Sequence, residues 1–144
     1  MAKSSRALAQ WHKIQELRKK NAENQARTSS AQLIAAEEQL QTLHGLRNRN
    51  SLDSGEMLNG LQLNSVQQFN QQIDHIIRLQ NQQVAIQESQ KRRTDQQLKE
   101  AWIEARKTEM LLERDARKQE QIENRKEQKQ LDEIASTTQR RQVS

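Results

Sequence analysis

The chain has 144 residues and a net charge of +5, and 30% of its side chains are charged while only 32% are hydrophobic. Globular domains are roughly 45–50% apolar, so this composition argues against a compact core. The chain has no cysteine, which excludes disulfides and thiolate metal sites and fits a reducing, cytosolic compartment. We expect neither a signal peptide nor a membrane span, because no apolar run approaches about 18 residues.

The glycines and prolines predict the architecture. Gly45, Gly55 and Gly60 lie in one short window, and the chain has no proline. Because these two residue types interrupt helices most strongly, two long helices joined by one bend are expected. We predict an all-α fold with one elongated domain over residues 1–144, in which two long helices form an antiparallel coiled-coil hairpin. The helices are placed at about residues 5–46 and 65–139, with the bend at 47–64, so that the second helix overhangs the first.

The first predicted helix carries apolar residues at spacings of three and four, which is the pattern of one buried helix face. The surplus of positive charge lies in residues 3–27, far from the bend, and favours an acidic partner surface there. The apolar positions are Ala7, Leu8, Trp11, Ile14, Leu17, Ala22, Ala26, Leu33, Ala36, Leu40, Leu43 and Leu46.

The second predicted helix begins with a possible capping box, because Ser65 precedes an apolar residue and Gln68 follows three residues later. Its apolar positions again have helical spacing. They are Val66, Phe69, Ile73, Ile76, Ile77, Leu79, Val84, Ile86, Leu98, Trp102, Ala105, Met110 and Leu112.

The two apolar stripes match best when the numbers of facing residues add to about 112 or 113. This register predicts that Leu43 faces Phe69 and that Trp11 faces Trp102. Between Leu17 and Leu33 the core positions hold small residues, so the middle of the hairpin is expected to be thinly packed. Residues 106–139 extend past the first helix, either as a solvated helix or as a shaft tip that docks into a partner.

Three segments resemble the FliJ family of flagellar export proteins. Residues 117–135 end in ENRKEQKQLDEIA, AEEQL occupies residues 36–40, and QQF at residues 67–69 is followed by Ile73. Their order and spacing agree with the family over essentially the whole chain. The resemblance implies an antiparallel coiled coil similar to the gamma-subunit stalk of rotary ATPases. It further implies insertion into the hexameric flagellar export ATPase, contact with the membrane export gate and escort of export chaperones.

The resemblance also implies a gate-binding patch beside the bend, although Leu46 and Asn50 stand where other members have aromatic residues. Two interpretations stay open for the apolar members: they form only the core, or they form a partly exposed edge that also binds. The patch comprises Gln39, Leu43, Leu46, Phe69, Ile73, Ile76 and Gln80.

The ATPase contact is expected in the paired termini, where a stiff shaft with charged sides suits the pore of a ring. Mixed charge on a helix also fits a merely solvated face. The candidate residues are Arg6, Lys13, Arg18, Lys19, Lys20, Arg114, Arg117, Glu123, Arg125 and Lys126.

Other function classes have less support. His12, His44 and His75 lie on separate stretches, and no phosphate-binding glycine loop or activated nucleophile is present, so we expect no enzyme, cofactor or metal. Nucleic-acid binding is a rival interpretation because of the basic runs, but acidic residues interleave with them. A generic coiled-coil tether is another. The favoured interpretation is a cytoplasmic protein, without nucleic acid or membrane insertion, held peripherally at the inner membrane of the flagellar base.

Overall fold

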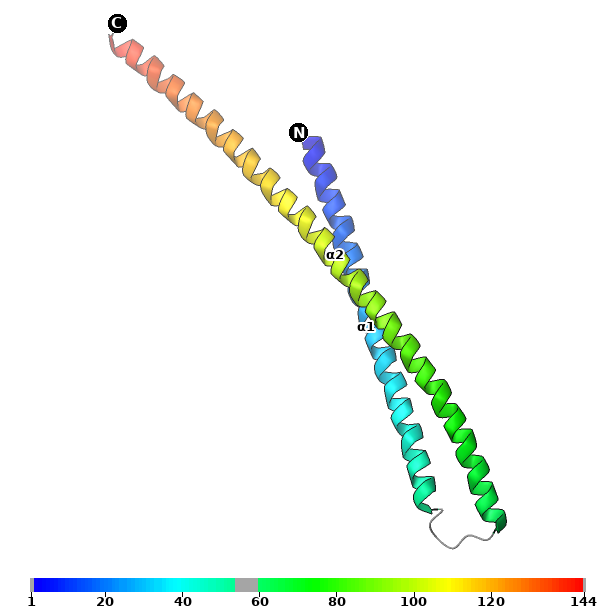
Figure 1. The fold of residues 1–144 in the computed structure, drawn as a ribbon. Helices are drawn as coiled ribbons and strands as arrows, with labels where there is room; N and C mark the ends of the chain where they lie inside the picture. Colours follow the sequence, from blue (N-terminus) through cyan, green and yellow to red (C-terminus); the bar gives the residue numbers. More distant parts are fainter. Residues whose placement is uncertain (1, 54–59, 144) are drawn as a thin grey trace. The chain divides into compact units, whose positions relative to one another are not determined.

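The structure, a computed structural model, describes residues 2–53 and 60–143, including the side chains of residues 4–50 and 60–142. The described chain is helical: α1 runs over Ala2–Asp53 and α2 over Gly60–Val143 (Figure 1). Its contacts divide it into two compact units. The terminal unit contains the residues up to Lys19 and those from Ala101 onward, and the bend-side unit contains Lys20–Glu100. In each unit a segment of α1 packs antiparallel to a segment of α2, which confirms the predicted all-α hairpin.

Both helices extend further than the predicted boundaries. Residues 47–53 and 60–64, assigned to the bend from the sequence, are helical, and Gly45 lies inside α1. A Cβ atom added at Gly45 would have no neighbour within 4 Å, so this glycine serves no close packing contact. One glycine in a helix costs only about 0.5–1 kcal/mol relative to alanine, which a long packed helix tolerates. Gly55 lies outside the described residues.

The predicted capping box at Ser65 is wrong. α2 already begins at Gly60, and the Ser65 hydroxyl donates a hydrogen bond to the carbonyl oxygen of Leu61 at 3.1 Å. A serine inside a helix commonly bonds to the carbonyl four residues earlier, as here, whereas a capping serine accepts from free amide groups.

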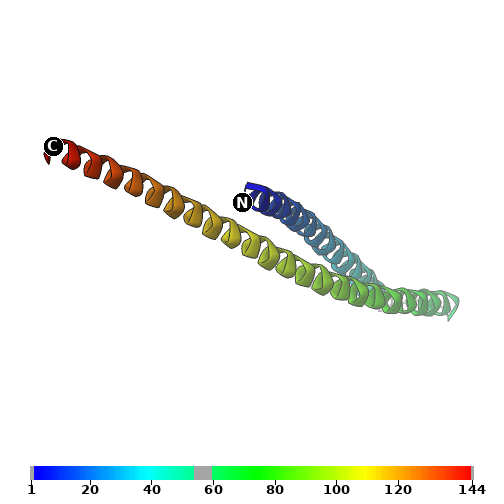
Figure 2. The same ribbon diagram turned by 90° about the horizontal axis from the view of Figure 1, so that it is seen from above.

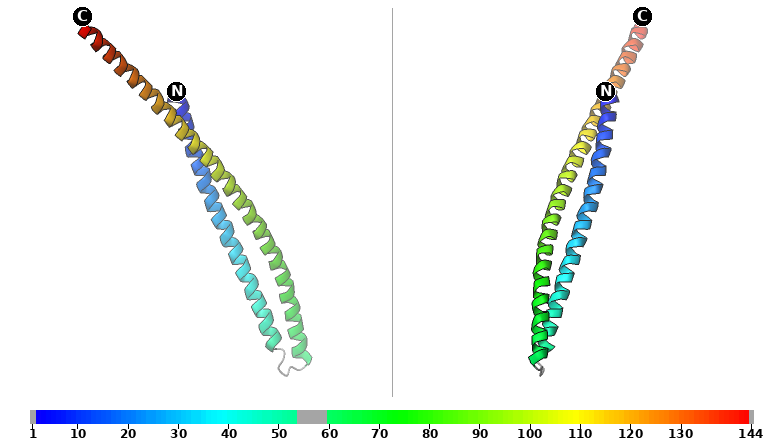
Figure 3. Two further views of the ribbon diagram at one scale, coloured as in Figure 1. Left: turned by 60° about the vertical axis from the view of Figure 1, so that its left-hand side comes forward. Right: turned by 90° about the vertical axis from the view of Figure 1, so that its right-hand side faces the viewer.

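The bend-side unit buries one row of residues on each helix, where α1 and α2 lie side by side (Figures 1 and 3). Spacings of three and four relate the members of each row, as in a coiled coil. The buried positions are Ala22, Ala26, Ser29 and Ala36 on α1 and Ile73, Ile77 and Thr94 on α2. Ala22, Ala26 and Ser29 confirm that small residues fill the middle of the first stripe. Alanine buries less apolar area than leucine, so this stretch gains less than the roughly 1.5–3 kcal/mol of each buried large aliphatic side chain.

The register differs from the predicted one by about one heptad. Arg47 Nε donates to Asp74 Oδ1 at 2.9 Å, and Asn50 Nδ2 donates to Asn70 Oδ1 at 2.8 Å. The numbers of facing residues therefore add to about 120. Leu43 consequently lies near Ile77, which is buried, rather than near Phe69, which is exposed. A heptad pattern matches itself after a shift of seven residues, so apolar spacing alone cannot choose between these registers, whereas polar pairs can.

The terminal unit has the same register and a largely polar interior. His12 Nδ1 lies 2.7 Å from Thr108 Oγ1, and Gln15, Ala105 and Thr108 are buried. The Thr108 hydroxyl donates to the carbonyl oxygen of Ala105 at 2.8 Å, so its bond with His12 requires the hydrogen to be on Nδ1. Trp11 is exposed, which overturns the predicted Trp11–Trp102 core contact.

α2 continues beyond the part of it that α1 covers, as predicted (Figure 2). All side chains of residues 120–142 are exposed. Within the described residues, neither helix contains a stretch of 18 residues that is apolar enough to span a membrane.

Candidate partner-binding surfaces

The structure separates the seven residues of the predicted gate-binding patch by exposure. Ile73 is buried, and Leu43 is half-buried in the row that packs between the helices. Leu46, Phe69 and Ile76 instead leave about half of their side-chain surface open. The patch is thus part core and part exposed apolar edge, and only the second part is available to a partner.

The two glutamines of the patch lie next to each other. Gln80 Nε2 donates to the carbonyl oxygen of Ala36 at 2.9 Å and to Gln39 Oε1 at 3.2 Å. Gln80 therefore bridges the helices, while Gln39 stays exposed. Both amides line a shallow groove together with Ala35, Glu38, Thr42 and Leu43. The groove offers a partner amide groups beside apolar surface.

Two polar pairs hold the helices together beside this edge, and the sequence reasoning missed both. Arg47 forms an ion pair with Asp74, and Asn50 pairs with Asn70. A buried or half-buried asparagine pair is a common device for fixing register in coiled coils. The signal in the sequence was that polar residues continue the spacing of each buried row near the bend: Arg47 and Asn50 follow Leu43 at spacings of four and three, and Asn70 precedes Ile73 by three.

The predicted ATPase-contact residues of α1 are placed on different sides of the helix. Arg6, Lys13, Arg18 and Lys20 are exposed, and Lys19 is half-buried. Lys19 Nζ lies 3.6 Å from the centroid of the Trp102 ring, and Arg18 Cζ lies 5.3 Å from that of Trp11. Each tryptophan thus carries a cation over its ring, an arrangement that is worth about 0.5–1 kcal/mol at an exposed site.

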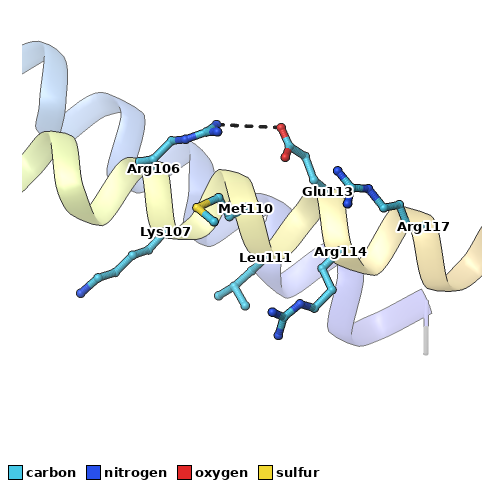
Figure 4. Close-up of a pocket in the computed structure, with 7 residues that line it drawn as sticks. All are labelled: Arg106, Lys107, Met110, Leu111, Glu113, Arg114 and Arg117. Carbon is cyan, nitrogen blue, oxygen red and sulfur yellow. Dashed lines mark ion pairs between the residues drawn. The ribbon is translucent and has the colours of Figure 1, made fainter.

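A second group of the predicted cations lines a groove of about 670 Å³ on α2 (Figure 4). The groove contains Arg114 and Arg117 together with the exposed apolar residues Met110 and Leu111. Lys107, Leu111 and Arg114 leave the helix on the same side (Figure 4). Arg106 forms ion pairs with Glu109 at 3.0 Å and with Glu113 at 3.9 Å. The groove therefore combines positive charge with apolar surface, which suits an acidic partner segment that also carries apolar side chains.

The other predicted contacts, Glu123, Arg125 and Lys126, lie on the exposed part of α2. No other described residue covers them. They are accessible, and nothing in the described chain orders their side chains into a defined site.

Catalytic and metal sites have no geometric support in the described residues. His12 faces Thr108 and lies 3.8 Å from Glu16, so its neighbours form a helix-surface pair. In the part of the chain that the structure describes, no three His, Cys, Asp or Glu side chains are grouped closely enough to hold a metal ion.

Comparison with known proteins gives a match to a protein family. The family model described as "Flagellar FliJ protein" matches residues 4–144, which include all the surfaces described above. Searches of curated proteins and of solved structures returned no match.

Proposed function

Because the chain belongs to the FliJ family, whose members are non-enzymatic components of flagellar protein export, we propose that it acts as the stalk of the export ATPase and couples that ATPase to the export gate. In this proposal the terminal unit enters the centre of the hexameric ring. The exposed edge of the bend-side unit binds the membrane-embedded gate. The action is mechanical: the stalk transmits conformational change and carries out no reaction.

The observation that carries the proposal is that the two units expose different chemistry. The terminal unit presents cations around Trp11, Trp102 and the groove at Arg114. The bend-side unit presents the apolar side chains of Leu46 and Phe69. Two helical units that expose different surfaces are suited to bind two different partners.

The exposed end of α2 supports the ring contact. Residues 120–142 make no core contact in the described chain, and an isolated charged helix is marginal in water. A surrounding partner would supply the missing contacts. We extend the proposal to the escort of export chaperones, and to peripheral association with the cytoplasmic face of the inner membrane at the flagellar base.

The ring contact is tested by co-purification with the export ATPase. A truncation ending at Lys107 should lose most of the binding of the full chain, and R114E/R117E should weaken it at least tenfold. The matched control is R92E/K99E, which reverses two exposed cations in the bend-side unit and should bind as the full chain does. Undiminished binding by the truncation would refute the ring contact of the overhang.

The gate contact is tested by binding to the cytoplasmic part of the gate protein. Leu46→Glu should abolish gate binding and leave ATPase binding intact, because it places a charge on the exposed apolar edge. Ile34→Glu is the control, since Ile34 is an equally exposed isoleucine that is outside the predicted patch. Equal loss of binding in both variants would contradict a specific role for the edge, and retention on DNA in place of either partner would favour the nucleic-acid alternative.

A further inference from the structure

α2 carries a second coiled-coil row in addition to the one that packs against α1. We call it the outer seam and define it by seven residues whose spacing alternates between three and four. Its four apolar members, Phe69, Ile76, Leu79 and Ile86, are between 46% and 60% exposed. Glutamines occupy the three remaining positions, Gln72, Gln83 and Gln90, which are also exposed.

The outer seam lies on a side of α2 that lacks charge. Helix periodicity places Gln68, His75, Gln82 and Ser89 next to it on the outward side. The opposite side of the same stretch, residues 69–90, holds Asp74, Arg78 and Glu88, and the next position of the seam's spacing after Gln90 is Arg93. In a chain with 30% charged residues, this segregation leaves one flank that can be buried without desolvating a carboxylate, an ammonium or a guanidinium group.

The groove geometry of the bend-side unit points to the same flank. Gln90 lines a shallow groove with Gln25, Thr28 and Gln32 of α1, and the only charged member of that groove is Arg93. The groove at Gln39, Thr42 and Gln80 lies on this flank as well. This second groove also includes Glu38. The flank is therefore recessed between α1 and α2, as a helix-binding surface requires, and each of the two grooves has one charged residue in an otherwise uncharged lining.

Six of the seven residues of the outer seam, those from Phe69 to Ile86, have the same order of apolar residues and glutamines in both directions. When two copies of the seam run antiparallel about a point between Ile76 and Leu79, Phe69 faces Ile86, Gln72 faces Gln83, and Ile76 faces Leu79. Apolar residues then meet apolar residues, and glutamines meet glutamines. A twofold interface needs this self-complementarity, since the same patch is used by both copies. In a parallel pair each residue faces its own copy, so any residue order gives matching contacts. In an antiparallel pair the contacts match only if the order is the same in both directions, and the residues from Phe69 to Ile86 meet this condition.

We propose that two copies of the chain associate through their outer seams as an antiparallel, twofold-symmetric pair of α2 helices. The interface buries the four apolar side chains of each copy and pairs the glutamine amides across the axis. Leu46 of α1 is also exposed. This dimer stands independently of the proposed gate contact, but it uses Phe69 and Ile76, so a copy in the dimer is unable to present these two residues to another partner.

Sedimentation equilibrium of the full chain tests the association. The wild type should shift with concentration from its monomer mass of 16.9 kDa to twice that value. Leu79→Glu should raise the dimer dissociation constant at least tenfold, because each copy then places a carboxylate against Ile76 of the other. Ile34→Glu, the control off the seam, should dimerise as the wild type does. The double variant I76K/L79E should dimerise better than L79E, since each new cation faces a new carboxylate across the axis.

Disulfide trapping tests the orientation of the two chains. Because the chain has no native cysteine, only the introduced cysteines can form disulfides. A mixture of Q72C and Q83C chains should form the mixed disulfide preferentially, because these positions face each other in the antiparallel pair. The proposal is overturned by a monomer at every concentration, by a dimer that L79E leaves unchanged, or by disulfides that join only identical positions. If L79E reduces helical circular dichroism, its effect on dimerisation reports unfolding. In that case disulfide trapping with Q72C and Q83C, which keep all the apolar residues of the seam, decides whether the antiparallel dimer forms.

Discussion

The clearest test of the observed packing compares two isoleucines in the bend-side unit. Ile73 is 4% exposed between the helices, and Ile34 is 52% exposed on α1. Both lie in helix interiors, and neither belongs to the outer seam. Replacing each by alanine removes the same atoms, so the difference between the two variants reports burial alone.

The expected free energies follow from that burial. Ile73→Ala removes a buried side chain and leaves a cavity, which costs about 3 kcal/mol within the usual range of roughly 2–5 kcal/mol. Ile34→Ala loses only about half of the roughly 1.5–3 kcal/mol of full burial. It regains a few tenths of a kcal/mol from the better helix propensity of alanine, so the net cost is about 0.5–1 kcal/mol. The two variants should therefore differ by about 2 kcal/mol in unfolding free energy.

Urea titration followed by helical circular dichroism measures this difference, with the protein dilute enough to be monomeric. For a urea slope of about 2 kcal/mol per M, the midpoint of Ile73→Ala should lie about 1 M below that of Ile34→Ala. Fluorescence supplies an internal control, because Trp11 and Trp102 both lie in the terminal unit. Equal midpoints, or a larger loss for Ile34→Ala, would refute the packing and register described here.

Three further predictions concern single features of the helices. Gly45→Ala should raise the unfolding free energy by about 0.5–1 kcal/mol, since open space surrounds the position; a loss in urea titration would mean that the glycine is needed. Asn50→Ala should cost about 1 kcal/mol by leaving the Asn70 amide without its partner, and N50A/N70A should cost less than the sum of the two single variants; strictly additive costs would rule out the pair. Lys19→Met should cost about 0.5–1 kcal/mol and increase acrylamide quenching of Trp102 in a W11F background; unchanged quenching would show that the ammonium does not cover the ring.

The sequence was sufficient to predict the helical hairpin because its helix interrupters lie in one window. The exact ends of the helices were harder to predict from the sequence. Gly45 is tolerated inside α1, where nothing packs against it, so the glycine window is wider than the break between the helices. Ser65 likewise resembled a cap in sequence, but its hydroxyl bonds within the helix.

The spacing of the apolar residues was not sufficient to predict the register of the two helices, for a physical reason. Two heptad rows agree equally well after a shift of one heptad, and few large aliphatic residues are present to discriminate. The contacts that distinguish the observed alignment are polar: Arg47 with Asp74, Asn50 with Asn70 and His12 with Thr108. Their partners cannot be paired from sequence until the register is known.

The sequence left open which members of the candidate patch are core and which are surface, for a related reason. Phe69, Ile76, Leu79 and Ile86 lie at helical spacings from one another, and Phe69 and Ile76 also lie four and three residues from Ile73, which is buried. A helix with two apolar rows therefore looks, in sequence, like a helix with one broad row. Exposure in the structure separates them.

One flank of the bend-side unit is charged and the other is rich in glutamine, so the dependence of binding on ionic strength can show which flank a partner occupies. Added salt screens charges over a Debye length of about 8–10 Å near physiological concentrations, whereas it barely affects contact between uncharged surfaces. Binding along the side that carries Asp74, Arg78 and Arg92 should therefore weaken steeply as salt rises. Binding along the glutamine-rich side should hold constant, so a salt titration of any complex identifies which flank of the helix pair is in use.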